Sequence, residues 1–122
     1  MLCKKPTIRS VIVILYTGNV MDCVVIADFK CKEGMAAEMG NVFREALVVT
    51  RGFDGCNAID VYFEEKTNTY TLIEDWDSLE QYEVYLQFRE DGGIAELLDP
   101  ILADGWEGVK ASIKRLGNIT DI

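Results

Sequence analysis

The sequence predicts an α+β domain, and three observations support this class. Apolar residues alternate with polar ones over residues 23–32, 59–64 and 70–76, as in strands with one buried face. Apolar residues recur at helical spacing between residues 35 and 51 and again after residue 76. The resulting order is strand, helix, strand, strand, helix, strand, which favours one antiparallel sheet with its helices on one face.

The first strand and first helix follow from the residues on their apolar faces. Residues 23–32 read CVVIADFKCK, with apolar side chains at the odd positions. In the segment that follows, Met39, Phe43 and Leu47 recur at helical spacing, and Gly52 supplies a stop. We therefore expect a strand that leads into an amphipathic helix.

The middle of the chain predicts a hairpin followed at once by a second helix. Residues 59–64 and 70–76 alternate on either side of a polar turn at residues 66–68. Ser78 and Gln81 have the spacing of a capping box, which places the start of the second helix within two residues of the strand end.

The C-terminal third predicts a short helix and a last strand. Residues 94–102 carry apolar side chains at helical spacing, although Pro100 removes a backbone donor from this segment. Residues 109–116 alternate and are predicted to be the fourth strand of the sheet. The complete order matches the ferredoxin-like βαββαβ arrangement with an insertion in the second helical region.

One face of this sheet is predicted to need a partner. Helices on one side of a four-stranded antiparallel sheet leave the other side bare, and Val24, Ile26 and Ile73 make that side apolar. We expect a homodimer in which the two open sheet faces pack together.

Composition limits the partners and the location of the chain. The 122 residues are enough for one domain, and 21 acidic against 12 basic side chains give a net charge of −9. Such a charge repels phosphate backbones and anionic membrane surfaces, so neither nucleic acid nor a membrane is an expected partner. The four cysteines suit a reducing cytoplasm, with Cys23 and Cys31 as core residues.

Neither a metal nor another cofactor is expected. The chain has no histidine, and its cysteines at positions 3, 23, 31 and 56 form no C-x-x-C pair, so the usual zinc spacings are absent. Any mechanism must also do without the most frequent general base.

Residues 1–20 are predicted to be an extension that adds a strand or an arm to a domain at residues 21–122. Basic residues precede an apolar run at residues 11–16, but this run is shorter than the ~7–15 residues of a signal-peptide core. It is also far below the ~20 apolar residues of a membrane span.

Three segments resemble the antibiotic biosynthesis monooxygenase family of dimeric α/β barrels. They are VVIADFKCKEG at residues 24–34, RGFDGCNAIDVYFEE at residues 51–65 and LIEDWDSLEQYEVYL at residues 72–86. The resemblance runs from about residue 23 to residue 116. It implies a ferredoxin-like dimer, but members of the family include quinol oxygenases, an isomerase and haem-degrading enzymes, so it leaves the reaction open.

One departure from the family pattern narrows the choice. Tyr85 stands where many relatives have histidine, and haem-degrading relatives rely on a histidine in this helix and an asparagine on the first strand. Here the first strand offers Ala27 and Asp28. Haem degradation is therefore disfavoured, because this helix has no evident neutral iron ligand.

The expected site lies where the third strand meets the second helix. A substrate that is itself an electron-rich phenolate or enolate can give an electron to oxygen without metal or flavin, provided that the protein holds the anion in a dry pocket. We predict that Arg89 stabilises the anion, that Tyr82 and Tyr85 hydrogen-bond its oxygens, and that Trp76 forms a flat wall. Trp76 and Arg89 should then converge on one hollow.

Further side chains are predicted to bind the ligand. Glu74 shares a strand face with Trp76, where burial would raise its pKa, but a structural hydrogen bond across the subunit boundary is the favoured role for it. The predicted ligand-binding residues are Glu74, Phe88 and Trp106.

Structural roles are the alternative for each of these residues. Trp76 also suits a core anchor, the two tyrosines suit packing, and Arg89 suits the helix dipole or an ion pair with Glu83 or Glu90. The functional prediction is a cofactor-independent monooxygenase of a quinol-like or polyketide-type aromatic molecule. A dimeric small-molecule binding module and an isomerase remain the alternatives.

Overall fold

The computed structural model describes residues 23–122, and its core is a sheet of four antiparallel strands in the order β2-β3-β1-β4. The extension predicted at residues 1–20 lies outside the described residues. The strands are β1 (Cys23–Lys30), β2 (Cys56–Glu64), β3 (Thr69–Trp76) and β4 (Lys114–Leu116), and the helices are α2 (Ala36–Arg51), α3 (Leu79–Asp91), α4 (Ile94–Leu98) and α5 (Gly105–Ser112).

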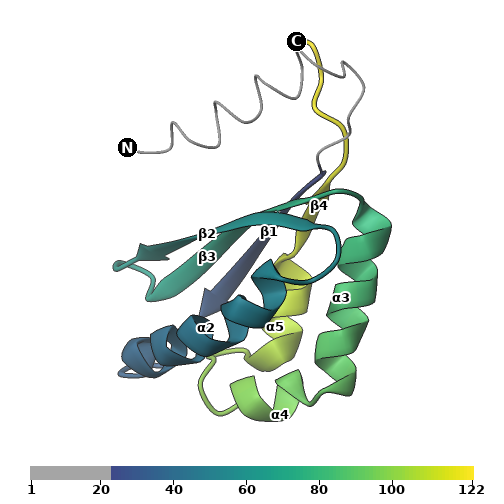
Figure 1. Cartoon of the computed structure of the whole chain (residues 1–122). Helices are drawn as coiled ribbons and strands as arrows, with labels where there is room; N and C mark the ends of the chain where they lie inside the picture. The colour runs from purple at the N-terminus through teal and green to yellow at the C-terminus, as the bar shows by residue number, and fades with distance from the viewer. Residues whose placement is uncertain (1–22) are drawn as a thin grey trace.

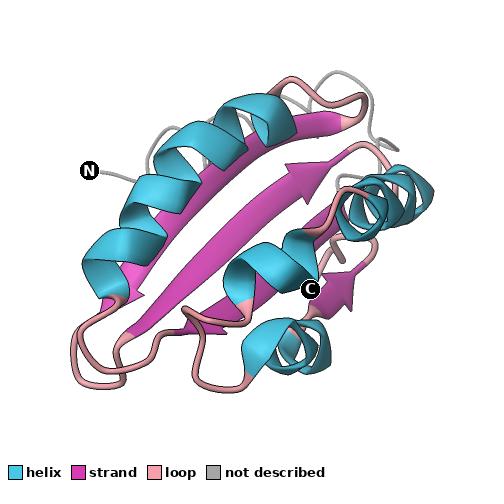
Figure 2. Cartoon of the chain, turned by 90° about the horizontal axis from the view of Figure 1, so that it is seen from below, coloured by secondary structure: helices cyan, strands magenta, loops and turns pink. Residues whose placement is uncertain are grey.

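The helices all cover one face of the sheet, which confirms the α+β, ferredoxin-like prediction (Figure 1, Figure 2). β3 lies between β1 and β2 and pairs with both over its whole length. Because β1 and β2 are both antiparallel to β3, they run parallel to each other and are joined by α2, as a split βαβ unit requires.

The core lies between the sheet and the helices and takes one face of each strand. In β1 the buried side chains, Cys23 among them, are at the odd positions, as the alternation predicts, and Cys31, just after the strand, is buried as well. The helical contribution from α2 comes mainly from Met39, Phe43 and Leu47, which are buried on one stripe of the helix.

The opposite face of the sheet carries the apolar side chains predicted there. Val24 and Ile26 are half-buried, and 38% of Ile73 is exposed. Ile26 and Ile73 are directly opposite each other in the β1–β3 pairing, so they form one patch.

The prediction of a strand over residues 109–116 is wrong for most of that segment. Residues up to Ser112 belong to α5, and β4 holds only three residues, paired with Val24–Ile26. Val109 and Ile113 satisfy a period of four as well as a period of two, and Trp106 supplies the preceding buried position of the helix. On the edge of β1 that β4 leaves unpaired, the N–H of Asp28 donates a hydrogen bond to the Oγ of Ser112, which takes the place of a strand partner.

The β3–α3 junction forms as the capping residues predict, with one change. Ser78 Oγ accepts a hydrogen bond from the N–H of Gln81, but it also donates to Gln81 Oε1 and so replaces the usual reciprocal bond to the backbone. Gly55 lies against this turn at a φ of 96°, where an added Cβ would be 2.7 Å from the Gln81 side chain. Only glycine therefore fits at the entry to β2 without moving α3.

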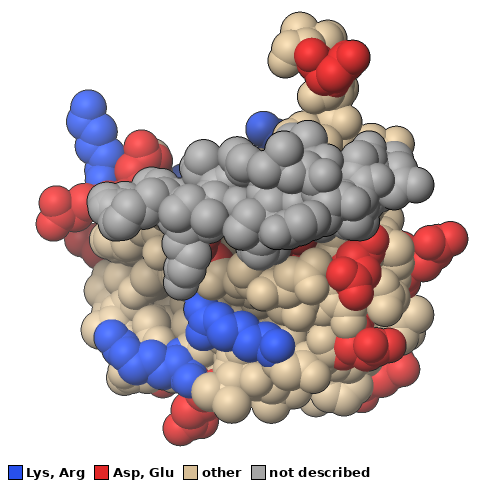
Figure 3. Space-filling model, turned by 45° about the horizontal axis from the view of Figure 1, so that its top comes forward, with Lys and Arg blue, Asp and Glu red and all other residues tan. Residues whose placement is uncertain are grey.

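Acidic side chains are spread around the margin of the face shown in Figure 3. This distribution accords with the excess of acidic over basic residues in the sequence. None of the helices within residues 23–122 is both long and apolar enough to cross a membrane.

Candidate active site

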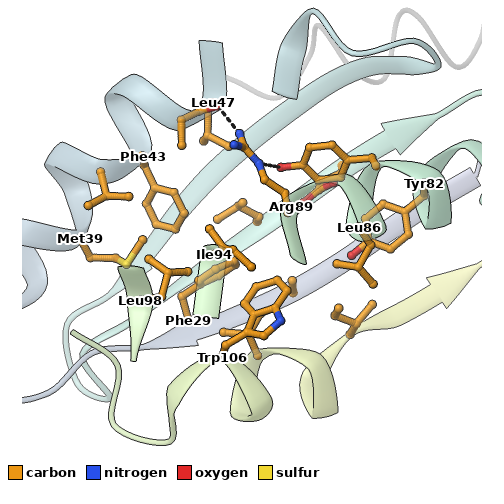
Figure 4. Close-up of a pocket in the computed structure, with 18 residues that line it drawn as sticks. Phe29, Met39, Phe43, Leu47, Tyr82, Leu86, Arg89, Ile94, Leu98 and Trp106 are labelled. Carbon is orange, nitrogen blue, oxygen red and sulfur yellow. Dashed lines mark hydrogen bonds between the residues drawn. The ribbon is translucent and has the colours of Figure 1, made fainter. Parts of the chain in front are cut away.

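A small apolar cavity lies between the sheet and the helices (Figure 4). Its volume is about 50 Å³, which suffices for dioxygen or a few water molecules but is well below the ~300–1,000 Å³ of pockets for drug-sized ligands. Aliphatic and aromatic side chains make up most of its wall. The polar side chains on the wall are Glu74, Tyr82, Tyr85 and Arg89.

Arg89 spans the gap between α3 and α2 at one side of the cavity. Its Nε donates to the Tyr85 hydroxyl over 2.9 Å, and its Nη2 donates to the Ala46 carbonyl over 2.7 Å and to Thr50 Oγ1 over 3.0 Å. In Figure 4 the guanidinium reaches toward Leu47 on α2. These bonds hold a charged group at the edge of an apolar space, with the two hydrogens of Nη1 left over.

The Tyr85 hydroxyl is held by two partners. It shares a hydrogen bond of 2.7 Å with Thr50 Oγ1, in which either hydroxyl can donate, and it accepts the bond from Arg89 Nε. Thr50 Oγ1 also lies 3.3 Å from the Ala46 carbonyl, to which it can donate. Burial raises the pKa of Tyr85, although the bonds from Arg89 and Thr50 lower it, and the hydroxyl stays neutral.

Glu74 places a carboxyl group inside the apolar wall, and only 5% of the residue is exposed. Its Oε1 accepts a hydrogen bond of 2.8 Å from Trp76 Nε1. Burial raises the pKa of Glu74 to about 7, and the bond from Trp76 lowers it less than burial raises it. The side chain is thus balanced between its two protonation states near neutral pH.

The second oxygen of Glu74 is free to meet a ligand. Oε2 accepts no hydrogen bond, and among residues 23–122 no fully buried side-chain oxygen or nitrogen lacks a partner. Oε2 must therefore reach open space, and the cavity is the space that Glu74 borders.

The Tyr82 hydroxyl is also free to meet a ligand. It has no hydrogen-bond partner although 98% of the residue is buried, and Figure 4 shows it directed toward Leu86 and the interior. Burial, followed by the charge of Glu74, raises the pKa of Tyr82, so this hydroxyl remains a donor. The cavity thus offers one free acceptor and one free donor.

A surface groove of about 410 Å³ lies beside the cavity, at the point where α3 passes into α4. Arg89 and Ile94 border both spaces, so they form the partition between them. Phe88, which is 46% exposed, and Leu97 line the outer side.

The comparisons with known proteins agree with this architecture. Residues 23–90 match the model of the family described as antibiotic biosynthesis monooxygenase, which is more than half of the chain. The chain belongs to this family. A search of curated proteins found no match.

Solved structures similar to this family member show the fold alone, because the sequence identities are low. A protein from Shewanella oneidensis is 13% identical with a TM-score of 0.66, over 82% of this chain and 93% of its own. A conserved protein from Methanosarcina mazei Go1 is 20% identical with a TM-score of 0.61, over 83% and 92% of the two chains. A protein from Chloroflexus aurantiacus, provisionally named an antibiotic biosynthesis monooxygenase, is 17% identical with a TM-score of 0.58, over 84% and 96%.

Five of the seven predicted site residues line the cavity. They are Glu74, Tyr82, Tyr85, Arg89 and Trp106. Trp106 lies in α5, and its Nε1 donates to Glu90 over 3.0 Å, so its ring is held by a group outside the cavity.

Two predicted residues lie elsewhere. Phe88 borders only the outer groove, and Trp76 is fully buried without reaching the cavity. The Tyr85 ring separates Trp76 from Arg89, because its centroid is 5.3 Å from the Trp76 ring and 5.4 Å from Arg89 Cζ. Of the pair expected to converge on one hollow, only Arg89 borders the cavity.

Sequence reasoning missed Thr50 and Phe53. Thr50 is fully buried and completes the Arg89 network, and its place seven residues after Phe43 on the apolar stripe of α2 could have indicated it. Phe53 packs on Trp76, Tyr85 and Phe88 from the loop after α2, where no periodicity marks it. Within the described residues, no group of three or more Cys, Asp or Glu side chains is arranged to hold a metal ion.

Proposed function

We propose that this protein is a cofactor-independent monooxygenase of a quinol-like or polyketide-type aromatic small molecule. The observation that carries the proposal is an apolar cavity that contains a fixed guanidinium, a free tyrosine hydroxyl and a free carboxyl oxygen. Membership of the antibiotic biosynthesis monooxygenase family supports the reaction class.

The proposed reaction needs only a substrate that ionises and a site that holds the anion. The substrate loses a proton, the anion gives one electron to dioxygen, and the resulting radical and superoxide combine to form a peroxide at carbon. In the keto tautomer of a phenol or quinol the reacting ring carbon is a CH₂ group. Loss of water from the peroxide converts this carbon to C=O, so CH₂ and O₂ give C=O and H₂O. The protein stabilises the anion and excludes bulk water.

The residues at the cavity have separate tasks in this proposal. Arg89 places positive charge beside the anion, and Tyr82 donates a hydrogen bond to its oxygen. Tyr85 keeps Arg89 in place by accepting the hydrogen bond from its Nε. Trp76 fixes Glu74 from behind the cavity wall.

The size of the inner space decides how a substrate fits. A bicyclic ring exceeds about 50 Å³, so its reactive end enters the cavity while its body occupies the outer groove against Phe88. Trp106 contacts the inner end, and the Ile94 side chain moves aside to admit it while Arg89 stays in place. The same small volume favours a second candidate, a dimeric module that binds a small molecule without converting it.

Oxygen uptake tests the proposed function. With reduced naphthoquinones or anthrones in chelator-treated buffer, we expect oxygen consumption above the autoxidation rate, and at least about a tenfold loss of rate in Arg89→Ala because the anion loses its charged partner. Arg44→Ala is the matched control, because Arg44 is an exposed arginine of α2 and should leave the rate unchanged.

Three results would contradict this function. Uptake equal to autoxidation for the whole substrate set would remove the oxygenase. Conversion without oxygen would indicate an isomerase, and saturable binding without any product would indicate the binding module.

We also propose that the open sheet face forms a homodimer around Ile26 and Ile73. Analytical ultracentrifugation at micromolar concentration should show a dimer, and Ile73→Glu should give a monomer because a charge in an apolar interface is left unpaired. Val84→Glu changes a 62% exposed residue on the helical side and should remain a dimer. A monomeric wild-type protein would contradict this assembly.

A further inference from the structure

We infer that Glu74 is the general base of this site and that it takes the proton of a phenolic hydroxyl group held by Tyr82. This inference rests on the proposed function and narrows its substrate class to phenols and quinols. It stands on the geometry of two unpaired polar groups in one cavity.

The carboxyl group of Glu74 is built like an oriented base. Trp76 Nε1 fixes Oε1 at 2.8 Å, and the fully buried indole of Trp76 leaves this oxygen no room to exchange partners with water. Oε2 is therefore left to face the cavity in a fixed direction. A base whose second atom is held by a neighbouring donor is the usual arrangement for proton abstraction in enzymes.

Tyr82 supplies the complementary group. A phenolic hydroxyl both donates and accepts, so it can donate to Glu74 Oε2 while it accepts from the Tyr82 hydroxyl. Tyr85 is less suited to this task, because its hydroxyl already has two hydrogen-bond partners, Thr50 and Arg89. The two free groups of the cavity are thus matched to one substrate hydroxyl.

In the proposed step the proton moves from the phenol to Glu74. The O–H bond of the phenol breaks, its proton forms a bond to Oε2 of Glu74, and the electron pair stays on the phenolate oxygen. Arg89 and Tyr82 then stabilise this phenolate, and Glu74 returns the proton to the peroxide when water leaves.

The pKa of Glu74 differs from those of the charged and titratable groups around it. Tyr82, Tyr85 and Arg89 face it from α3, Cys56 from β2, and Arg115 lies over the Tyr82 ring from β4. The hydrogen bond to Glu83 raises the pKa of Arg115, and burial raises the pKa of both tyrosines. Burial raises the pKa of Cys56 to about 11. Glu74, with a pKa of about 7, is therefore the group of this set that changes charge near neutrality.

The decisive variant is Glu74→Gln, which keeps an oxygen acceptor for Trp76 but accepts no proton. The wild-type rate should rise with pH and level off above about 7, whereas Glu74→Gln should lose at least about 100-fold and show no such midpoint. Tyr82→Phe should lose rate but keep the midpoint. Glu45→Gln, on the exposed side of α2, should match the wild type.

A binding experiment gives a second readout that does not depend on oxygen chemistry. 4-Nitrophenol absorbs visible light as its anion, so its spectrum reports whether the bound phenol has lost its proton. Bound to the wild type between pH 7 and 8 it should be less ionised than when bound to Glu74→Gln at the same pH, because the carboxylate of Glu74 and the phenolate oxygen share one proton and two negative charges side by side are unfavourable.

The two readouts separate failure of this inference from failure of the proposed function. An active oxygenase in which Glu74→Gln keeps the wild-type rate and pH midpoint would overturn the role of Glu74 and leave the function intact. A protein without oxygenase activity whose bound nitrophenol still shares its proton with Glu74, so that wild type and Glu74→Gln differ, would support the base and overturn the oxygenase. Identical nitrophenol spectra in wild type and Glu74→Gln would overturn the base.

Discussion

Glu74→Gln should make the fold more stable than the wild type by about 3 kcal/mol at pH 8. The pKa of Glu74 is about 7 in the fold against 4.5 in the unfolded chain, and one pKa unit corresponds to about 1.4 kcal/mol. Above pH 7 the folded protein must hold a carboxylate that burial disfavours. Glutamine is neutral at every pH and still accepts the hydrogen bond from Trp76.

The sign of the pH dependence follows from proton uptake. Between pH 4.5 and 7 the folded chain binds the Glu74 proton more tightly than the unfolded chain, so this residue's contribution to stability is greatest below pH 4.5 and is lost as pH rises through 7. The difference in unfolding free energy between Glu74→Gln and wild type should therefore be small at pH 4.5 and largest at pH 8.

Urea unfolding at several pH values measures this difference. Using the difference between two variants cancels the contributions of the other acidic residues, and both proteins must be compared at equal concentration. Glu45→Gln should track the wild type at all pH values. Parallel stability curves for wild type and Glu74→Gln would show that the carboxyl group is not held in an apolar environment.

This stabilisation and the loss of activity expected for the same variant have one physical origin. A carboxyl group that is kept ready to accept a proton near neutral pH must be poorly solvated, and poor solvation destabilises its charged form. A site that contains such a poorly solvated group lowers the stability of the fold, and a loss of stability in exchange for activity is common in active sites.

The architecture was predictable because each strand and helix has one buried face. The alternation in β1 and the spacing of Met39, Phe43 and Leu47 in α2 fix the period of each element without reference to its partners. The error at residues 109–116 arose where Val109 and Ile113 fit both periods. Only the packing of Trp106 against the core decides between them.

Contacts within the site were predictable only between residues of the same strand or helix. Glu74 and Trp76 are two positions apart on one strand, so the period of two placed them on the same side, and they share a hydrogen bond. The bond of Arg89 to Thr50 joins two helices, and the distance between these helices cannot be predicted from the sequence pattern of either one. The volume of the cavity depends in the same way on how Tyr85 fills the space beside Arg89.

Truncation of Trp76 should have the largest effect on stability of any substitution at the site. Trp76 is fully buried, and its ring lies within 5.5 Å of the rings of both Tyr82 and Tyr85. Replacing a buried tryptophan by alanine costs about 3–5 kcal/mol, against a total stability of about 5–15 kcal/mol for a domain. Trp76→Ala should therefore be close to unfolding at pH 8, where Glu74 is also charged.

Trp76→Phe separates the hydrogen bond from the packing. Phenylalanine fills most of the space but has no N–H, and the Trp76 N–H is the group that lowers the pKa of Glu74. Its removal should raise that pKa above about 7 and move the midpoint of the pH–rate profile upward. The loss of stability should be larger at pH 8 than at pH 5, because the bond to the carboxylate contributes more than the bond to the neutral acid.

Trp106→Phe is the control for this pH dependence. Its indole N–H also binds a glutamate, Glu90, but that carboxyl group is partly exposed, and its bonds to Lys110 and Trp106 lower its pKa. Glu90 is therefore charged at both pH 5 and pH 8, so the loss of stability in Trp106→Phe should be the same at the two values. An equal loss at pH 5 and pH 8 in Trp76→Phe would show that Trp76 acts through packing alone and does not position Glu74.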